Sequence, residues 1–176
     1  MNRRLALFVA MICLVAILAG CKSKPTSTTT TTQPATTRGP GPLPKNGFKA
    51  VISFPDPPAK LRAGEITNIN FKVKNASDVV WWQRGGETND RADNKFYIAA
   101  GSHWMDKEGN YTTEPEGHNG IPKDLRPAEE TEMTLQITAP KTPGDWTLEL
   151  DMVQEGVAWF REMGSSTTKV KVTVVK

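Results

Sequence analysis

Cysteine is scarce in this chain and confined to its beginning. The 176 residues include two cysteines, Cys13 and Cys21. No disulfide can therefore form within the long region that follows residue 21. Because an exported domain of ordinary size often relies on such bonds, we expect this one to depend on the packing of its core instead.

Histidine is equally rare, which bears on metal binding. His103 and His118 are the only two, and they lie fifteen residues apart. No His-x-x-x-His or paired-carboxylate spacing brings ligands together around them. Asp106, Glu108 and Asn110 repeat the first ligand spacing of a calcium loop, but its other ligands are missing, so a hairpin turn explains this stretch better. We expect no metal and no other cofactor.

The sequence also lacks the common catalytic signatures. It contains no G-x-S-x-G elbow and no glycine-rich phosphate loop, and no cysteine after residue 21 could act as a nucleophile. Glu149 and Asp151 alternate with apolar residues, as solvated charges on a strand do. The sequence therefore predicts a protein that is not an enzyme.

The first twenty residues have the parts of a secretory signal peptide. Arg3 and Arg4 precede an apolar run from Leu5 to Ala19, which is too short for a comfortable membrane span. The following "LAGC" resembles the bacterial lipobox. That resemblance implies cleavage before Cys21 and acylation of this cysteine, which would bind membrane lipid and hold the protein in the cell envelope, outside the cytoplasm. The alternative is an ordinary signal peptide or an uncleaved anchor.

Residues 21–45 predict a tether. Threonine and proline dominate "KSKPTSTTTTTQPATTRGPGPLPK", and such a composition buries too little surface to fold. Six of the 22 basic residues precede residue 46, which leaves 16 against all 19 acidic residues and a net charge of −3 for residues 46–176. Nucleic-acid binding, which needs a dense basic face, is therefore not expected.

Residues 46–176 read as one all-β domain. Apolar residues alternate at period two, turn residues separate the segments, and no segment of ten residues shows a helical period. An antiparallel, two-sheet sandwich of the immunoglobulin-like type fits this length best, with a barrel as the alternative. The expected strands are 48–54, 66–75, 79–83, 95–104, 131–139, 145–154, 157–160 and 167–175.

The alternation also predicts which side chains form the core. On each strand, every second residue is large and apolar, while its neighbours are polar. The predicted core residues are Ile69, Phe71, Val73, Met133, Leu135, Ile137, Trp146, Leu148, Leu150, Met152, Val170, Val172 and Val174.

Four stretches resemble a known family. They are "VKNASDVVWW", "HWMDKEG", "IPKDLRPAEE" and "PGDWTLELDMVQEGVAWFREMGS". Together they are similar to the immunoglobulin-like domain of autophagy cargo receptors and of many bacterial surface proteins, over most of residues 50–174. The resemblance implies that Trp81 lies in the core. Ala128 departs from the family, which tends to have glycine in this turn, and so does Trp82.

Trp82 and Tyr97 are the candidate ligand contacts. If Trp81 points inward, its neighbour Trp82 points outward. Tyr97 is also expected to point outward, because its neighbours Phe96 and Ile98 are expected to point inward. The alternative for Trp82 is burial under the loop 84–94. Trp159 and Phe160 are also neighbours, so one of them is expected to face away from the core.

These observations lead to three functional hypotheses. The first is a membrane-anchored, non-catalytic binding module for an envelope protein or polysaccharide. The second is a structural or accessory subunit of an envelope complex, without a ligand of its own. The third, an envelope hydrolase, requires a cleft with converging acids. The oligomeric state does not follow from the sequence.

Overall fold

The computed structural model describes residues 41–84, 93, 95–112 and 117–176. The predicted signal peptide, Cys21 and most of the predicted tether lie outside these ranges. None of the described helices has both the length and the apolar character needed to cross a membrane.

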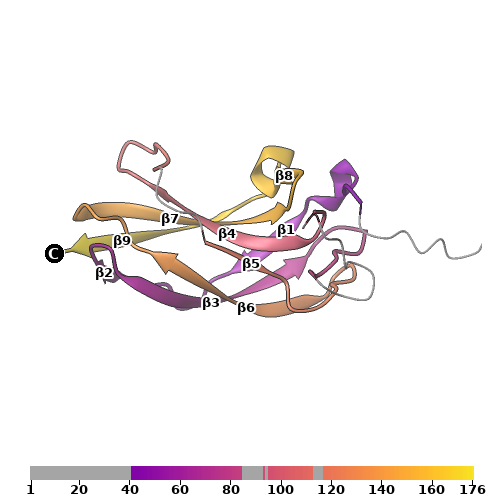
Figure 1. The fold of residues 1–176 in the computed structure, drawn as a ribbon, viewed down its shortest axis with the longest axis horizontal. Coiled ribbons are helices and arrows are strands. Elements are labelled where there is room, and N and C mark those ends of the chain that lie inside the picture. The colour runs from indigo at the N-terminus through magenta and orange to yellow at the C-terminus, as the bar shows by residue number, and fades with distance from the viewer. Residues whose placement is uncertain (1–40, 85–92, 94, 113–116) are drawn as a thin grey trace, which may run out of the picture. The chain divides into compact units, whose positions relative to one another are not determined.

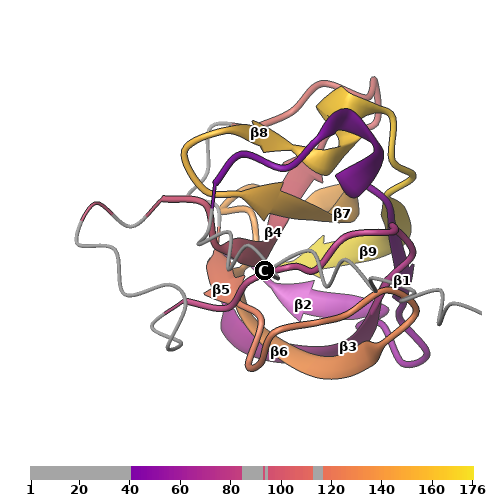
Figure 2. The same cartoon turned by 90° about the vertical axis from the view of Figure 1, so that its right-hand side faces the viewer.

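The described chain forms two β-sheets that pack face to face (Figures 1 and 2). The small sheet has the order β1-β3-β6, and the large sheet the order β2-β9-β7-β4-β5, with β8 paired to β7. The strands are β1 (Ala50–Ser53), β2 (Lys60–Arg62), β3 (Ile66–Asn75), β4 (Ile98–Met105), β5 (His118–Gly120), β6 (Glu130–Thr138), β7 (Gly144–Gln154), β8 (Ala158–Trp159) and β9 (Thr168–Val175).

The topology is that of an immunoglobulin-like sandwich. Every strand pair is antiparallel except β2 with β9. The orders β1-β3-β6 and β9-β7-β4 correspond to strands A-B-E and G-F-C of that fold. The prediction of an all-β, two-sheet sandwich is therefore confirmed. Two short 3₁₀ helices, η1 (Lys45–Gly47) and η2 (Phe160–Met163), complete the described elements.

One predicted strand, 79–83, is wrong. Only Trp81 pairs there, in an isolated bridge with Leu125. Asn75 is the reason, because its buried side chain organises a turn in place of a ladder. Its Nδ2 donates to the carbonyl oxygens of Val79 and Leu125, at 2.8 and 2.9 Å, and its Oδ1 accepts from the backbone and hydroxyl of Ser77.

The predicted core is largely confirmed. Trp81, fully buried, donates its indole N–H to the carbonyl of Gly47 at 2.9 Å. Its ring meets Phe160 edge-on at 5.1 Å, and Phe160 meets Phe48 at the same distance. Two expected core residues, Trp146 and Val170, are only partly buried.

The large sheet is buried on both faces in its centre. All residues of β4 are buried, as are those of β7 from Thr147 onward. The reading of Glu149 and Asp151 as solvated charges was therefore wrong, because each is only 1% exposed. The cause is η2, because the backbone N–H of its Arg161 donates to Asp151 at 3.2 Å and its guanidinium donates to Glu149 at 3.0 Å.

Both edges of the small sheet are covered. Along β6, Asn119 donates its Nδ2 to the carbonyl of Thr134 at 2.7 Å. Along β1, the N–H of Ala50 donates to the hydroxyl of Ser165 at 3.0 Å, and the hydroxyl of Thr168 donates to the carbonyl of Ile52 at 2.8 Å. These bonds occupy part of the backbone along each edge, where an added strand would have to pair.

The chain enters the domain at a defined end. Gln154, buried at the end of β7, donates its Nε2 to the carbonyl of Gly41 at 3.0 Å and accepts the N–H of Leu43 at 2.8 Å. Leu43 also packs against the core. These residues, expected in the tether, thus contact the domain. The other end of β7, at Gly144, pairs with Val174 near the C-terminus (Figure 1).

Candidate functional site

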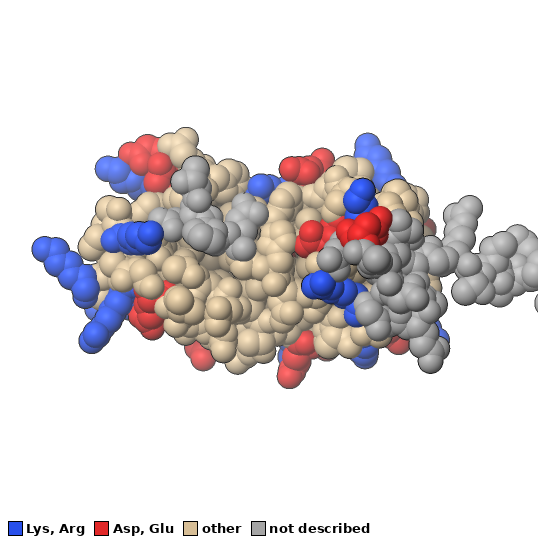
Figure 3. Space-filling model, in the orientation of Figure 1, with Lys and Arg blue, Asp and Glu red and all other residues tan. Residues whose placement is uncertain are grey.

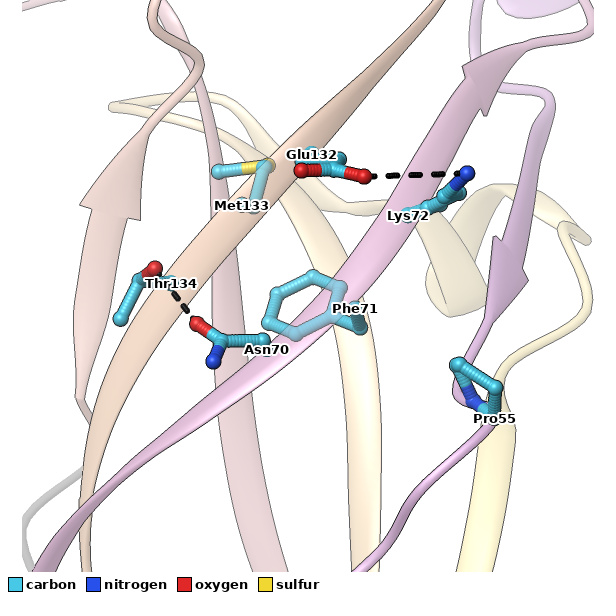
Figure 4. A pocket seen from close by; sticks show the side chains of 7 residues that line it. All are labelled: Pro55, Asn70, Phe71, Lys72, Glu132, Met133 and Thr134. Carbon is cyan, nitrogen blue, oxygen red and sulfur yellow. Dashed lines mark hydrogen bonds and ion pairs between the residues drawn. The ribbon is translucent and has the colours of Figure 1, made fainter.

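A shallow hollow of about 380 Å³ lies over β3 and β6 (Figure 4). Its outward polar groups already pair across the strands. The Thr134 hydroxyl donates to Oδ1 of Asn70 at 2.7 Å, and Lys72 Nζ lies 3.7 Å from a Glu132 oxygen. Phe71, which borders it, is buried in the core. The described residues that line the hollow therefore offer a ligand no exposed aromatic ring.

The outer face of the large sheet carries a richer arrangement, which we call the aromatic strip. At one end the Arg161 guanidinium lies 4.5 Å from the ring centre of Tyr111 and 5.5 Å from that of Trp159. The Trp159 ring in turn meets His118 edge-on at 5.0 Å. At the other end the Arg84 guanidinium lies 5.5 Å from the ring centre of Tyr97. The strip consists of Tyr111, Arg161, Trp159, His118, Tyr97 and Arg84.

The ring of Trp159 packs against Gly101 of β4, where no side chain could fit. A Cβ atom added at Gly101 would lie 2.5 Å from Cη2 of Trp159 and 3.1 Å from the His118 ring. The buried His103 ring packs against the indole on another side, with ring centres 4.3 Å apart. Trp159 is therefore half-buried and held in one orientation, while its neighbour Phe160 enters the core. This confirms that the two adjacent rings face different ways.

Glu149 holds the strip to the sheet from below. Its carboxylate accepts hydrogen bonds from the hydroxyls of Tyr111 at 2.7 Å and Thr167 at 2.6 Å, and from Arg161 at 3.0 Å. Lys169 Nζ lies 3.3 Å away. Burial acts to raise the pKa of Glu149, but the bonds from Thr167 and Tyr111 and the charge of Lys169 outweigh it, so the pKa lies below its usual value.

Asp151 binds the backbone of the same region. Its carboxylate accepts the N–H of Met152 at 2.7 Å and that of Arg161, within η2, at 3.2 Å. Burial raises its pKa to about 6, against the opposing effect of these two N–H groups. Both buried acids of β7 are thus occupied by bonds that include Arg161 of η2.

A second hollow, of about 300 Å³, lies beside the strip. Gly120 of β5 lies next to the Tyr97 ring: a Cβ atom added at Gly120 would lie 3.7 and 3.8 Å from two of its ring carbons. His118 borders the hollow and pairs with Glu155 at 2.8 Å. Burial and the nearby Glu155 charge raise the pKa of Tyr97. The residues that line this hollow are Gln83, Arg84, Tyr97, His118, Asn119, Gly120, Ile121 and Pro122.

One of the two predicted contact residues lines this hollow. Tyr97 lines the hollow, whereas Trp82, which is half-buried, is not among the lining residues. Its carbonyl accepts the N–H of Ile98 at 2.9 Å. Residues 85–92, most of the loop expected to cover Trp82, are outside the described residues, as is the predicted lipidation site Cys21.

Sequence reasoning did not predict the strip as a unit. Its members come from β5, β8, η2 and loops, so no local spacing connects them. The one available signal was the adjacency of Trp159 and Phe160. His103 and His118 do converge, but on the Trp159 ring, and the described residues contain no group of three or more His, Cys, Asp or Glu arranged to hold a metal ion.

The stretch Asp106–Asn110 is a turn, as predicted. The Asp106 carboxylate accepts the backbone N–H of Asn110 at 2.8 Å and its side-chain amide at 3.0 Å. These bonds lower the pKa of Asp106. Gly109 supplies the positive φ of 88° that the turn requires. The carboxylate of Asp106, the first residue with calcium-loop spacing, therefore stabilises the turn.

Comparisons with known proteins place the chain by its fold only. No family model matches it, and no curated protein matches it. The CARDB domain of the PF1109 protein from Pyrococcus furiosus is 12% identical, with a TM-score of 0.42, covering 78% of this chain and 90% of that one. The C-terminal domain of wzt is 10% identical, with a TM-score of 0.43, covering 72% and 71%.

A third similar structure is the beta-glucosidase from Listeria innocua in complex with glucose. It is 14% identical, with a TM-score of 0.45. The match covers 73% of this chain but only 16% of the glucosidase. At identities this low, the likeness concerns the β-sandwich alone.

Proposed function

We propose that this chain is a lipid-anchored protein of the bacterial envelope whose sandwich is a non-catalytic binding module for a glycan or an envelope protein. The lipobox resemblance at Cys21 and the Thr/Pro-rich composition of the following residues support the anchor and its tether. The motifs similar to the immunoglobulin-like domain of cargo receptors and bacterial surface proteins support a role in binding.

The aromatic strip is the observation that carries this proposal. It combines three rings that remain partly accessible with two guanidinium groups and an imidazole, on one face of one sheet. Tyr111 is 46% exposed. Flat rings beside hydrogen-bond donors suit sugar rings and extended polymers. The covered edges of the small sheet favour binding on this face over strand addition.

The two buried acids of β7 support a role without catalysis. Glu149 and Asp151 are each 1% exposed and are occupied by structural hydrogen bonds. A general acid or base has to reach a substrate proton within hydrogen-bond distance. In addition, no carboxylate is among the described residues that line the hollow beside Tyr97.

The test compares ligand capture by two matched variants of the lipidated, full-length protein in mild detergent. Tyr97→Ser with His118→Ser alters the strip, and Asn70→Ala with Thr134→Ala alters the hydrogen-bonded pair on the other sheet. We expect glycan arrays or envelope extracts to show a bound species that only the strip variant loses. Equal retention by both variants would contradict the proposal. So would an obligate, stoichiometric subunit without any ligand, which would favour an accessory role.

A further inference from the structure

The outer face of the large sheet continues past the aromatic strip onto a row of cations. Lys60 and Arg62 project from β2, and Lys169 and Lys171 from β9; all four are exposed. The intervening Leu61 belongs to the core, as does Val172, so alternation places the four cations on the outward face. We call these four residues the basic edge.

Three acids adjoin the four cations of the basic edge. Besides the buried Glu149, Asp145 accepts the Thr173 hydroxyl at 3.0 Å, and Glu65 accepts the backbone N–H of Arg62 at 2.7 Å. Lys171 Nζ donates to the hydroxyl of Thr147 at 2.9 Å, and Lys169 shares the buried Glu149 with Arg161. Within the part of the chain that the structure describes, Lys60 and Arg62 form no side-chain ion pair. Basic side chains project from the end of the molecule that carries the C-terminus (Figure 3). This local excess stands out because residues 46–176 have a net charge of −3.

The strip and the basic edge meet at one residue. Glu149 accepts from Tyr111 and Arg161 of the strip and lies 3.3 Å from Lys169 of the edge. The parallel pairing of β2 with β9 places Lys60 beside Thr173, one strand away from this row. Alternate residues on one strand lie roughly 6.6 Å apart, so the two cations of each strand are spaced by about that distance.

We propose that the ligand of this face is an anionic glycan. The strip would contact the sugar rings, and the basic edge would pair with carboxylate or phosphate groups along the polymer. This inference deepens the proposed function and rests on it. Rings next to the cations favour a sugar polymer over an acidic protein, and the negative net charge disfavours nucleic acid.

The experiment measures binding of the lipidated, full-length protein in non-ionic detergent to four immobilised polymers. Polygalacturonate carries carboxylates, phosphorylated dextran carries phosphates, unmodified dextran is neutral, and poly-glutamate is anionic without sugar. We expect binding to one or both anionic glycans, weakening steeply with salt, and little binding to dextran or poly-glutamate. Which anionic glycan binds assigns the charged group.

Matched variants locate the binding surface. The edge variant combines Lys60→Gln, Arg62→Gln and Lys171→Gln, and the control combines Lys49→Gln, Lys72→Gln and Lys74→Gln, which lie on or next to the small sheet. We expect the edge variant to bind about tenfold more weakly, with a shallower salt dependence, and the control to bind nearly as the wild type does. Thermal melting checks that both variants fold. The salt dependence of binding by the wild type tests the role of charge independently of any variant.

Three results would overturn the inference. They are equal weakening in the two variants, poly-glutamate binding as tight as that of the anionic glycans, and dextran binding as tight as theirs. If dextran binds and the strip variant loses it, the proposed binding function stands while the anionic-glycan inference fails. If no polymer, array glycan or envelope extract binds, both fail.

Discussion

Ala128 occupies a backbone position that glycine normally fills. The N–H of Glu129 donates to the carbonyl of Arg126 at 3.0 Å, with Pro127 and Ala128 between them. Ala128 has a φ of 68°. A proline followed by a positive φ is the pattern of a type II turn, whose third position favours glycine. The glycine that the family tends to have here therefore has a physical cause, and the alanine is strained.

This strain makes Ala128→Gly a stabilising substitution. Removing the strain of alanine in the left-handed region stabilises the folded state by about 1 to 2 kcal/mol. The greater conformational entropy of glycine in the unfolded chain offsets part of this gain. We expect the free energy of unfolding in urea to rise by roughly 0.5 to 1 kcal/mol. Ala76→Gly, at an exposed residue not in that conformation, should lower it. A decrease for Ala128→Gly would contradict the turn assignment.

Gly101 leaves the space that the Trp159 ring occupies, because it has no side chain. Because a Cβ there would lie 2.5 Å from Trp159, Gly101→Ala should displace the indole and destabilise the fold by about 1 to 3 kcal/mol. Gly120→Ala is the matched control, since its Cβ would meet ordinary contacts at 3.7 Å or more. Urea unfolding followed by tryptophan fluorescence checks both. Equal stability and unchanged emission in Gly101→Ala would show that Trp159 does not lie over β4.

At the scale of elements, the alternation of apolar and polar residues predicts a strand well when one face of that strand is exposed to solvent. The strand β3 (Ile66–Asn75) matches its predicted bounds because its polar side faces solvent. The buried acids Glu149 and Asp151 of β7 were misread because the following segment, η2, folds back onto that face and bonds them through Arg161. The strands β2 and β5, each three residues long, were missed because so short a segment has no period to detect.

The contact between β7 and η2 is expected to respond to pH through Asp151. A carboxyl whose pKa is raised to about 6 in the folded state, from 3.8, adds stability that is fully present below 3.8 and lost as pH rises through 6. Glu149, with a lowered pKa, acts in the opposite sense, because its contribution is lost as pH falls through its folded-state value.

The prediction concerns the comparison of wild type with Asp151→Asn. Between pH 7 and pH 5 we expect the wild type to gain about 1 kcal/mol of stability relative to the variant. Urea unfolding at the two pH values measures this difference, and comparison with the variant cancels the effects that the two proteins share. A difference that stays constant, or changes sign, would show that Asp151 is not a buried acid.

At the scale of the whole molecule, the anchor and the sandwich come from different kinds of evidence. The sandwich follows from strand periodicity and is described by the structure. The composition of the tether was predictable, but not its end, because the bonds from Gln154 to Gly41 and Leu43 depend on tertiary contacts. The strip could not be predicted for the same reason, since its residues meet only in the folded chain.

The anchor is tested by mass spectrometry of the mature N-terminus. We expect the chain to begin at Cys21, with a diacylglyceryl group on the thiol and an acylated amine, and to fractionate with membranes. Several acyl chains on one residue exceed what stable anchoring requires. Cys21→Ala should remove the diacylglyceryl group and block cleavage at this site, so the N-terminal peptide should lack both modifications. An unmodified thiol at residue 21 of the wild type would contradict the lipobox prediction.

The most direct test of the binding face follows the five tryptophan indole N–H signals by NMR. The full-length, ¹⁵N-labelled protein in detergent is titrated with the best-binding glycan. Trp159 lies in the strip, whereas the indoles of Trp81 and Trp104 are buried and bonded to the carbonyls of Gly47 and Thr138. We predict that the Trp159 signal shifts in a saturable way while those of Trp81 and Trp104 stay in place. Saturation of binding without any shift at Trp159 would contradict this account.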